Sequence, residues 1–236
     1  MPPLLPGRRE RMRAATLQEI RDAARGLLIA EGRHAVTINA VARKIGMSGP
    51  AIYRYYSSHD DLIAALTADF YRELTDELQK ERIEGRINLL AMCRRMRRWA
   101  LDHKAEFGLM FASAPPPPGC ETAAHEVHEA GHAFGRVFVE EVGAIWRHTR
   151  FPIPDVEKMP ADLADQLEAF SGHIEGALPA EATYVFLNCW IRLYGLLCME
   201  VFQQLDFALT DAEPFYEECL QELCRMLDVE YLPPPQ

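Results

Sequence analysis

Apolar residues recur at helical spacing along almost the whole of this 236-residue chain. Leu17, Ile20, Ala24 and Leu27, for example, share one face of a helix that ends near Gly32. No segment alternates apolar and polar residues as a half-buried strand does. The sequence also contains no internal repeat. The pattern therefore predicts an all-α protein.

The same periodicity predicts the helices of the C-terminal part, and proline-containing segments separate them. A tetraproline at residues 115–118 cannot be helical and is expected to form an extended surface loop. Helices are expected over residues 86–103, 105–112, 123–148, 162–174, 181–205 and 212–227.

Charge is distributed unevenly along the chain. Residues 1–60 carry ten Lys and Arg against five Asp and Glu, whereas residues 61–236 carry fifteen against thirty. A basic N-terminal part on an acidic body indicates that the first part binds a polyanion. A chance imbalance on a solvated surface is the alternative.

Three further features of the sequence indicate the cellular compartment. The longest apolar run, near residues 195–202, is interrupted by Glu200, so no membrane-spanning segment is expected. At the N-terminus the apolar residues precede the basic ones, the reverse of a secretory signal. The six cysteines lack CxxC spacing and are expected to be buried, reduced thiols, with a sensing role for Cys120 as the alternative. These features predict a cytoplasmic protein, and no cofactor is expected.

Residues 37–56 are typical of a helix-turn-helix. Thr37 can cap a short helix that Gly46 ends, and Ser48 can cap a second helix of about eight residues. Ile52 and Tyr56 are four residues apart on this second helix and should both face a core. Tyr53 and its neighbour at position 54 should then point toward solvent or a ligand.

On these residues the N-terminal part resembles the DNA-binding domain of TetR-family transcriptional regulators. The resemblance covers residues 16–66 and is carried by residues 37–42, 46–48 and 51–56 and by Leu62. It implies phosphate contacts from Thr37, Tyr53 and Tyr55, and base contacts from Ser48, Gly49, Pro50, Ala51 and Arg54. His59 stands where family members commonly have Lys. Because His is mostly neutral, we expect a weaker phosphate contact there and a shallower salt dependence of DNA binding.

The C-terminal part resembles the domain of some TetR-family members that is named for a Trp-His-Gly pattern, although Tyr194 replaces the His between Trp190 and Gly195. The resemblance implies ligand binding and homodimer formation. The expected organisation is a flexible basic arm over residues 1–15, the helix-turn-helix domain over 16–62, the ligand-binding and dimerisation domain over 63–228 and a tail over 229–236.

Two sets of residues are candidates for these roles, with the intrachain core as the alternative for each member. The candidates for an apolar ligand pocket are Phe107, Met110, Phe111, Phe134, Phe138, Trp146, Tyr184 and Trp190, with Phe186 beside them. The candidates for the dimer interface are Leu187, Ile191, Tyr194, Cys198, Phe215, Leu220, Leu223 and Leu227.

An HExxH motif at residues 128–132 offers a different interpretation. In zinc peptidases two His at this spacing bind the ion, here His128 and His132, and the Glu, here Glu129, polarises a water. The alternative function is therefore a zinc-dependent hydrolase or a metal-binding protein. The motif also arises by chance in a helix rich in His and Glu, and the sequence as a whole favours a protein that is not an enzyme and has no metal site.

The sequence thus predicts a homodimeric regulator, most simply a repressor, that a small apolar effector releases from a pseudo-palindromic double-stranded operator. A third interpretation, an adaptor that has lost its affinity for DNA, rests on His59 alone.

Overall fold

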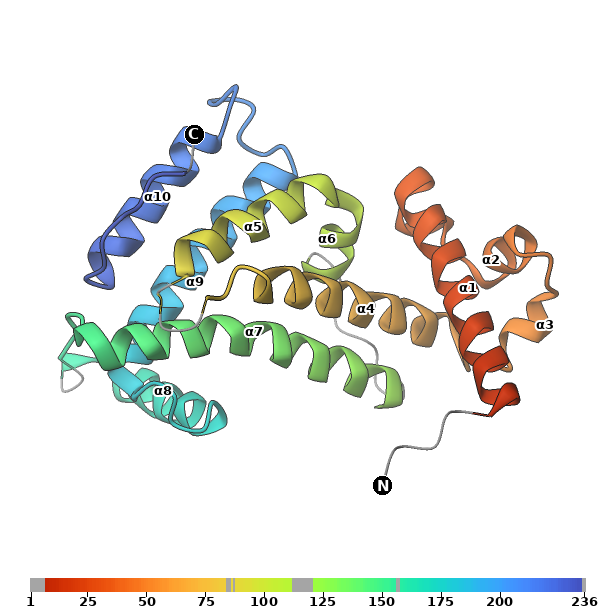
Figure 1. Cartoon of the computed structure of the whole chain (residues 1–236), viewed down its shortest axis with the longest axis horizontal. Helices are drawn as coiled ribbons and strands as arrows, with labels where there is room; N and C mark the ends of the chain where they lie inside the picture. The colour runs from red at the N-terminus through yellow and green to blue at the C-terminus, as the bar shows by residue number, and fades with distance from the viewer. Residues whose placement is uncertain (1–6, 84–85, 87, 112–120, 156–157, 235–236) are drawn as a thin grey trace. The chain divides into compact units, whose positions relative to one another are not determined.

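The computed structural model describes residues 7–83, 86, 88–111, 121–155 and 158–234. All regular secondary structure within these residues is helical, which confirms the expected fold class (Figure 1). The helices are α1 (Arg8–Glu31), a short 3-10 turn η1 (Arg33–Ala35), α2 (Ile38–Lys44), α3 (Gly49–Ile52), α4 (His59–Gln79), α5 (Leu89–Asp102), α6 (Lys104–Phe111), α7 (Glu121–Thr149), α8 (Ala161–His173), α9 (Ala180–Val201) and α10 (Glu213–Met226). The tetraproline loop and Cys120 lie outside the described residues.

The start of α1 corrects the expectation of a flexible arm. The helix begins at Arg8, so residues 8–15 of that arm are helical. Arg13 holds this part of α1 to the end of the helix-turn-helix: its guanidinium lies 5.1 Å from the centroid of the Tyr55 ring and donates to the Arg54 carbonyl at 3.4 Å. Residues 1–6 lie outside the described part of the chain.

One compact unit comprises Met1–Glu73 and His103–His132, and it differs from the expected domain at residues 16–62. Helices α1, α2 and α3 pack together in it (Figure 1). Helix α6 also packs against α1. A three-helix ion-pair network accounts for the difference. Arg25 on α1 binds Glu73 on α4 at 2.7 Å and Glu106 on α6 at 3.0 Å. Helix α6 is therefore tied to the helix-turn-helix, although more than 40 residues separate them in sequence.

The second unit comprises Leu74–Asp102 and Ala133–Gln236. Helix α9 contacts α5, α8 and α10 in this unit and supplies much of its core (Figure 1). Tyr216 on α10 is fully buried and donates its hydroxyl to the Cys93 carbonyl on α5 at 2.8 Å. Arg97 on α5 binds Glu200 on α9 at 2.6 Å. These polar contacts fix the positions of α5, α9 and α10 within the unit.

Helix α9 also corrects an expectation. The helix has 22 residues, and a stretch of 18 of them has a mean hydropathy of 1.3, so by length and composition it alone among the described helices could cross a membrane, although no such segment was expected. Nine of its residues, among them Phe186, Leu193 and Leu197, are buried in the second unit. A core helix passes the same test of length and composition.

The segment after α10 is held by polar contacts. Arg94 on α5 binds the Glu217 carboxylate through two nitrogens, at 2.9 and 2.8 Å, and donates to the Leu232 carbonyl at 2.7 Å. Tyr231 donates its hydroxyl to Glu217 at 2.7 Å. Burial alone would raise the pKa of Glu217, but the hydrogen bonds from Arg94 and Tyr231 outweigh it and lower that pKa. Most of the expected tail is therefore attached to the second unit.

Candidate nucleic-acid interface

Helix α2 forms as its sequence predicts. Thr37 accepts a hydrogen bond from the Ala40 backbone N–H at 3.2 Å and so caps the helix. Its core face is buried, and Gly46, with φ of 71°, makes the turn that follows. The Met47 N–H returns to the Ala42 carbonyl at 2.9 Å, which closes the helix before the second element begins.

Helix α3 is shorter than predicted. Only Gly49–Ile52 are α-helical, and the chain then continues in tight turns, with the Tyr55 N–H bonded to the Ile52 carbonyl at 2.8 Å. Ser48 occupies the capping position, but its side chain makes no capping hydrogen bond. The first turn is therefore held by its backbone and by packing.

The division between core and outward residues is as predicted. Ile52 is fully buried and Tyr56 is 7% exposed, whereas Tyr53 between them is 54% exposed. Ser48, Pro50 and Arg54 are exposed, and Gly49, Ala51 and Tyr55 are half-buried. The first turn of α3 and the ring of Tyr53 thus form one accessible surface of small and polar groups. We call this surface, residues 48–51 with 53 and 54, the reading turn.

Gly49 leaves room for the Asn39 side chain of α2. A Cβ atom at this position would lie 2.8 Å from Oδ1 of Asn39, closer than real Cβ contacts. Any larger residue here would have to displace the Asn39 side chain. The sequence resemblance included Asn39 but did not assign it this role.

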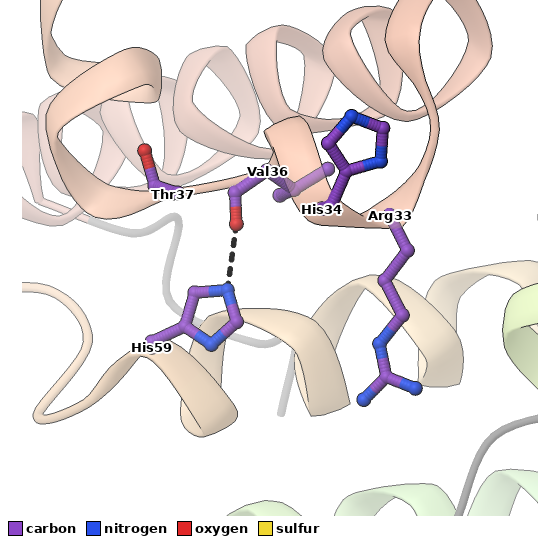
Figure 2. Close-up of a pocket in the computed structure, with 5 residues that line it drawn as sticks. All are labelled: Arg33, His34, Val36, Thr37 and His59. Carbon is purple, nitrogen blue, oxygen red and sulfur yellow. Dashed lines mark hydrogen bonds between the residues drawn. The ribbon is translucent and has the colours of Figure 1, made fainter.

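His59 at the start of α4 binds the backbone next to Thr37. Its Nε2 lies 2.6 Å from the Val36 carbonyl oxygen, and its Nδ1 lies 3.5 Å from Asp60 (Figure 2). An open pocket on this surface is lined by Arg33, His34, Val36, Thr37 and His59. Figure 2 shows His59 and Arg33 on the same side of this loop. His59 therefore connects the start of α4 to the residue before the α2 cap.

The first turn of α4 is stabilised by two serines that precede it. The Asp61 N–H donates to the Ser58 hydroxyl at 3.0 Å, and the Ser57 hydroxyl donates to the Asp61 carboxylate. Asp60 and Asp61 also stand at the positive end of the helix. These contacts fix the point at which the chain leaves the helix-turn-helix.

The candidate pocket residues do not form one group. Phe107 and Met110 are buried in the first unit, where the Phe107 and Phe111 ring centroids lie 4.7 Å apart. Phe134, Phe138 and Trp190 belong to the second unit. There the ring centroid of Trp190 lies 5.9 Å from that of Phe134 and 5.4 Å from that of Phe138.

This second group extends along α9. Trp190 stacks on Tyr194 with an interplanar angle of 2° and lies 6.5 Å from Phe186. The group of Phe134, Phe138, Phe186, Trp190 and Tyr194 is named here the Trp190 cluster. Trp146 stands apart from it, packed against Phe151 at 4.8 Å with the Arg150 guanidinium 5.1 Å from its ring. Tyr184 is half-buried, and its backbone carbonyl accepts from Asn188 at 2.9 Å.

The candidate dimer residues divide by exposure. Leu220 and Leu227 are fully buried and Leu223 is 2% exposed, so these three belong to the core of the single chain and not to an interface. This corrects the prediction, because their apolar face is covered by the chain's own helices. Ile191 on α9 and Phe215 on α10 are 66% and 55% exposed. Leu187, Tyr194 and Cys198 are half-buried.

The HExxH residues lie on α7 and are exposed: His128, Glu129 and His132. Glu129 pairs with His125 at 3.3 Å. A catalytic zinc site takes three protein ligands, and no three His, Cys, Asp or Glu side chains converge within the described ranges. The arrangement therefore lacks the donor set of a zinc hydrolase.

The described cysteines are buried or half-buried, as predicted. Burial raises the pKa of Cys93 and raises the pKa of Cys189 to about 12. Burial also raises the pKa values of Cys198, Cys219 and Cys224. A thiol whose pKa is raised is rarely ionised near neutral pH and reacts slowly.

The Arg25 network is a feature that sequence reasoning missed. Glu106 is 2% exposed, and Arg25 lies over the Phe70 ring at 5.1 Å. Because Arg25 and Glu106 are 81 positions apart, no local pattern could have paired them.

A helix-turn-helix with an accessible reading turn, joined to a larger helical body, defines the class of DNA-binding transcriptional regulators. Residues 20–66 match the family model described as bacterial regulatory proteins, tetR family. Residues 89–223, more than half of the chain, match the model of a tetracyclin repressor-like C-terminal domain. The chain belongs to the TetR family, whose members are regulators and not enzymes.

Curated relatives agree with this assignment. The chain is 31% identical over 118 residues to the HTH-type transcriptional regulator Rv1816 of Mycobacterium tuberculosis and equally so to Mb1846 of Mycobacterium bovis. Each match covers 48% of this chain and 50% of the relative, so the chain spans about half the length of the curated relatives it matches.

Solved structures agree over almost the whole chain. A crystal structure of the regulatory protein SCO4313 is 27% identical with a TM-score of 0.72, and the match covers 93% of this chain and 98% of that one. A protein of unknown function from Rhodococcus sp. RHA1 is similar in fold, with a TM-score of 0.64 at 19% identity over 90% of this chain and 93% of that one.

Proposed function

We propose that the protein is a homodimeric repressor that inserts the reading turn of each copy into adjacent major grooves of a pseudo-palindromic operator. The observation that carries this proposal is the exposure of Tyr53 and the first turn of α3 beside the buried Ile52 and Tyr56. Small side chains at positions 48–51 let the backbone approach base edges, and Arg54 can donate to a base or a phosphate. Two such turns would lie about 34–36 Å apart, or a multiple of that distance.

Helices α9 and α10 carry the proposed dimer interface. Ile191 and Phe215 expose large apolar side chains on two helices that pack against each other. A second copy would remove both from water, at a gain of about 25 cal/mol per Å² of apolar surface. Arg192 and Glu222 form an exposed ion pair, 3.0 Å long, between the same two helices and would lie at the polar rim.

The proposed effector is a small apolar molecule that binds at the Trp190 cluster. The edge-to-face and stacked rings around Trp190 offer aromatic surface, and Trp190 itself is only half-buried. A ligand there would release DNA by favouring a state in which α4 is displaced. The Arg25–Glu73 pair would transmit such a displacement to α1, since it joins α4 to the helix-turn-helix.

Genomic footprinting with the full-length protein would identify the operator, and fluorescence anisotropy on that duplex would measure affinity. The proposal expects two chains per duplex and a loss of affinity when Tyr53 is replaced by Ala. By thermodynamic linkage, an effector that weakens DNA binding must itself bind more weakly to the DNA complex by the same factor, typically about 5–150-fold. Footprints that lack two-fold symmetry, or equal effector affinity with and without operator, would contradict the model.

A further inference from the structure

His128 and His132 form a close pair on the surface of α7. They are one helical turn apart, both side chains are exposed, and their ring centroids lie 4.2 Å apart with the planes tilted by 51°. Neither residue belongs to the reading turn. The pair thus presents two imidazoles to solvent at a spacing that a single ion can bridge.

The neighbouring groups leave this pair available. Glu129, between the two His in sequence, pairs with His125 at 3.3 Å and not with either of them. Glu126 lies 3.9 Å from Arg72 of α4. Neutral imidazole is a preferred ligand of zinc, nickel and copper, whereas magnesium and calcium prefer oxygen ligands.

We propose that His128 and His132 chelate one divalent transition-metal ion per chain, with water completing its coordination. Two protein ligands with water suit a reversible surface site, since no third donor converges there among the described residues. The site is a binding site and not a hydrolytic centre. Its existence does not depend on the proposed operator or effector.

Metal at this site would stabilise one turn of α7 that packs against α4. A Cβ atom on Gly131, between the two His, would lie 3.9 Å from the Tyr71 ring, so this turn lies close to α4. A bound ion that links residues four apart opposes fraying of that turn. Because the ion binds only the folded pair, saturating metal should raise the thermal unfolding temperature.

The test is isothermal titration calorimetry at pH 7.5, in which nickel or zinc is titrated into the full-length protein without an affinity tag. We expect one ion per chain and at least about tenfold weaker binding for His128→Ala and for His132→Ala. His125→Ala is the matched control on the same exposed helix and should bind as the wild type does. Magnesium should produce no binding heat.

Three outcomes would overturn the proposal. The first is the absence of nickel and zinc binding to the wild type. The second is unchanged binding in the His128→Ala/His132→Ala double variant, which would place the ion on other groups such as the cysteines. The third is equal loss in the His125→Ala control. Circular dichroism of each variant would check that the helical content is unchanged, and a loss of binding with intact helicity supports the chelate.

Discussion

The Arg25 guanidinium donates to the Glu106 carboxylate at 3.0 Å, and Glu106 is almost completely buried. Arg25 also binds Glu73, and the two carboxylates raise its pKa even though burial acts in the opposite direction. A buried carboxylate without its cation would carry an uncompensated charge. The contact therefore links α6 to α1 and α4 through one side chain, beside the contact of Tyr71 on α4 with Phe111 on α6.

Arg25→Ala should destabilise the protein by about 3 kcal/mol, because it leaves Glu106 buried and unpaired. The Arg25→Met/Glu106→Gln double variant removes both charges and should recover much of that loss. Urea unfolding monitored by circular dichroism measures both values. Equal destabilisation by the single and double variants would show that the lost packing, and not the unpaired charge, accounts for the effect.

Tyr53 and Tyr56 form a matched pair of substitutions three residues apart. Tyr53→Ala should weaken operator binding and change the free energy of unfolding by no more than about 0.5 kcal/mol, because the ring is exposed. Tyr56→Ala should cost about 3–5 kcal/mol of stability, as for other large buried aromatic residues. Anisotropy on the operator and thermal unfolding separate the two effects. Unfolding of the Tyr53 variant would contradict its assignment to the reading turn.

His59 gives a prediction on salt dependence. His59→Lys places a fixed cation near the α2 cap and should steepen the slope of log affinity against log salt by up to about 0.9 per half-site. His59→Gln keeps a neutral donor that can reach the Val36 carbonyl and should leave the slope unchanged. Titrations at several salt concentrations give the slopes. Identical slopes for all three proteins would mean that position 59 does not face a phosphate.

Charged substitutions on α9 and α10 test the proposed dimer interface. Ile191→Glu and Phe215→Glu each place a carboxylate on an exposed apolar position and should shift the protein from dimer to monomer in light scattering. Met12→Glu is the control, because Met12 is also exposed but lies on α1. A dimer that survives the paired substitution of 191 and 215 would place the interface elsewhere.

Alkaline pH should destabilise the second unit. Burial raises the folded-state pKa of Cys189 from 9.0 to about 12, so the unfolded chain loses this proton first. The stabilisation is therefore complete below pH 9 and is lost as the pH rises from 9 towards 12. Cys189→Ala removes this group and should make the decline of the unfolding free energy above pH 9 shallower. A decline of unchanged steepness would assign it to other groups, such as Tyr216, whose pKa burial also raises.

Local pattern predicted the helices and the division of Ile52 from Tyr53, because both depend on spacing along a single helix. It overestimated α3, since the change from α-helical to tighter turns after Ile52 leaves the order of apolar residues unaltered. It also placed Leu220 at an interface, because periodicity identifies an apolar face and not the partner that covers it. The Glu106 contact joins residues distant in sequence and could be found only from the folded chain.

The close approach of Gly49 to Asn39 has a consequence for retargeting the protein to a new DNA sequence. A library that randomises positions 50, 51, 53 and 54 varies groups that point outward or pack loosely. Position 49 is different, since a Cβ atom there would lie 2.8 Å from Oδ1 of the exposed Asn39 side chain, which would have to move away. Residues 39 and 49 should therefore be held constant or changed together, and variation in operator preference among engineered versions should come from the other four.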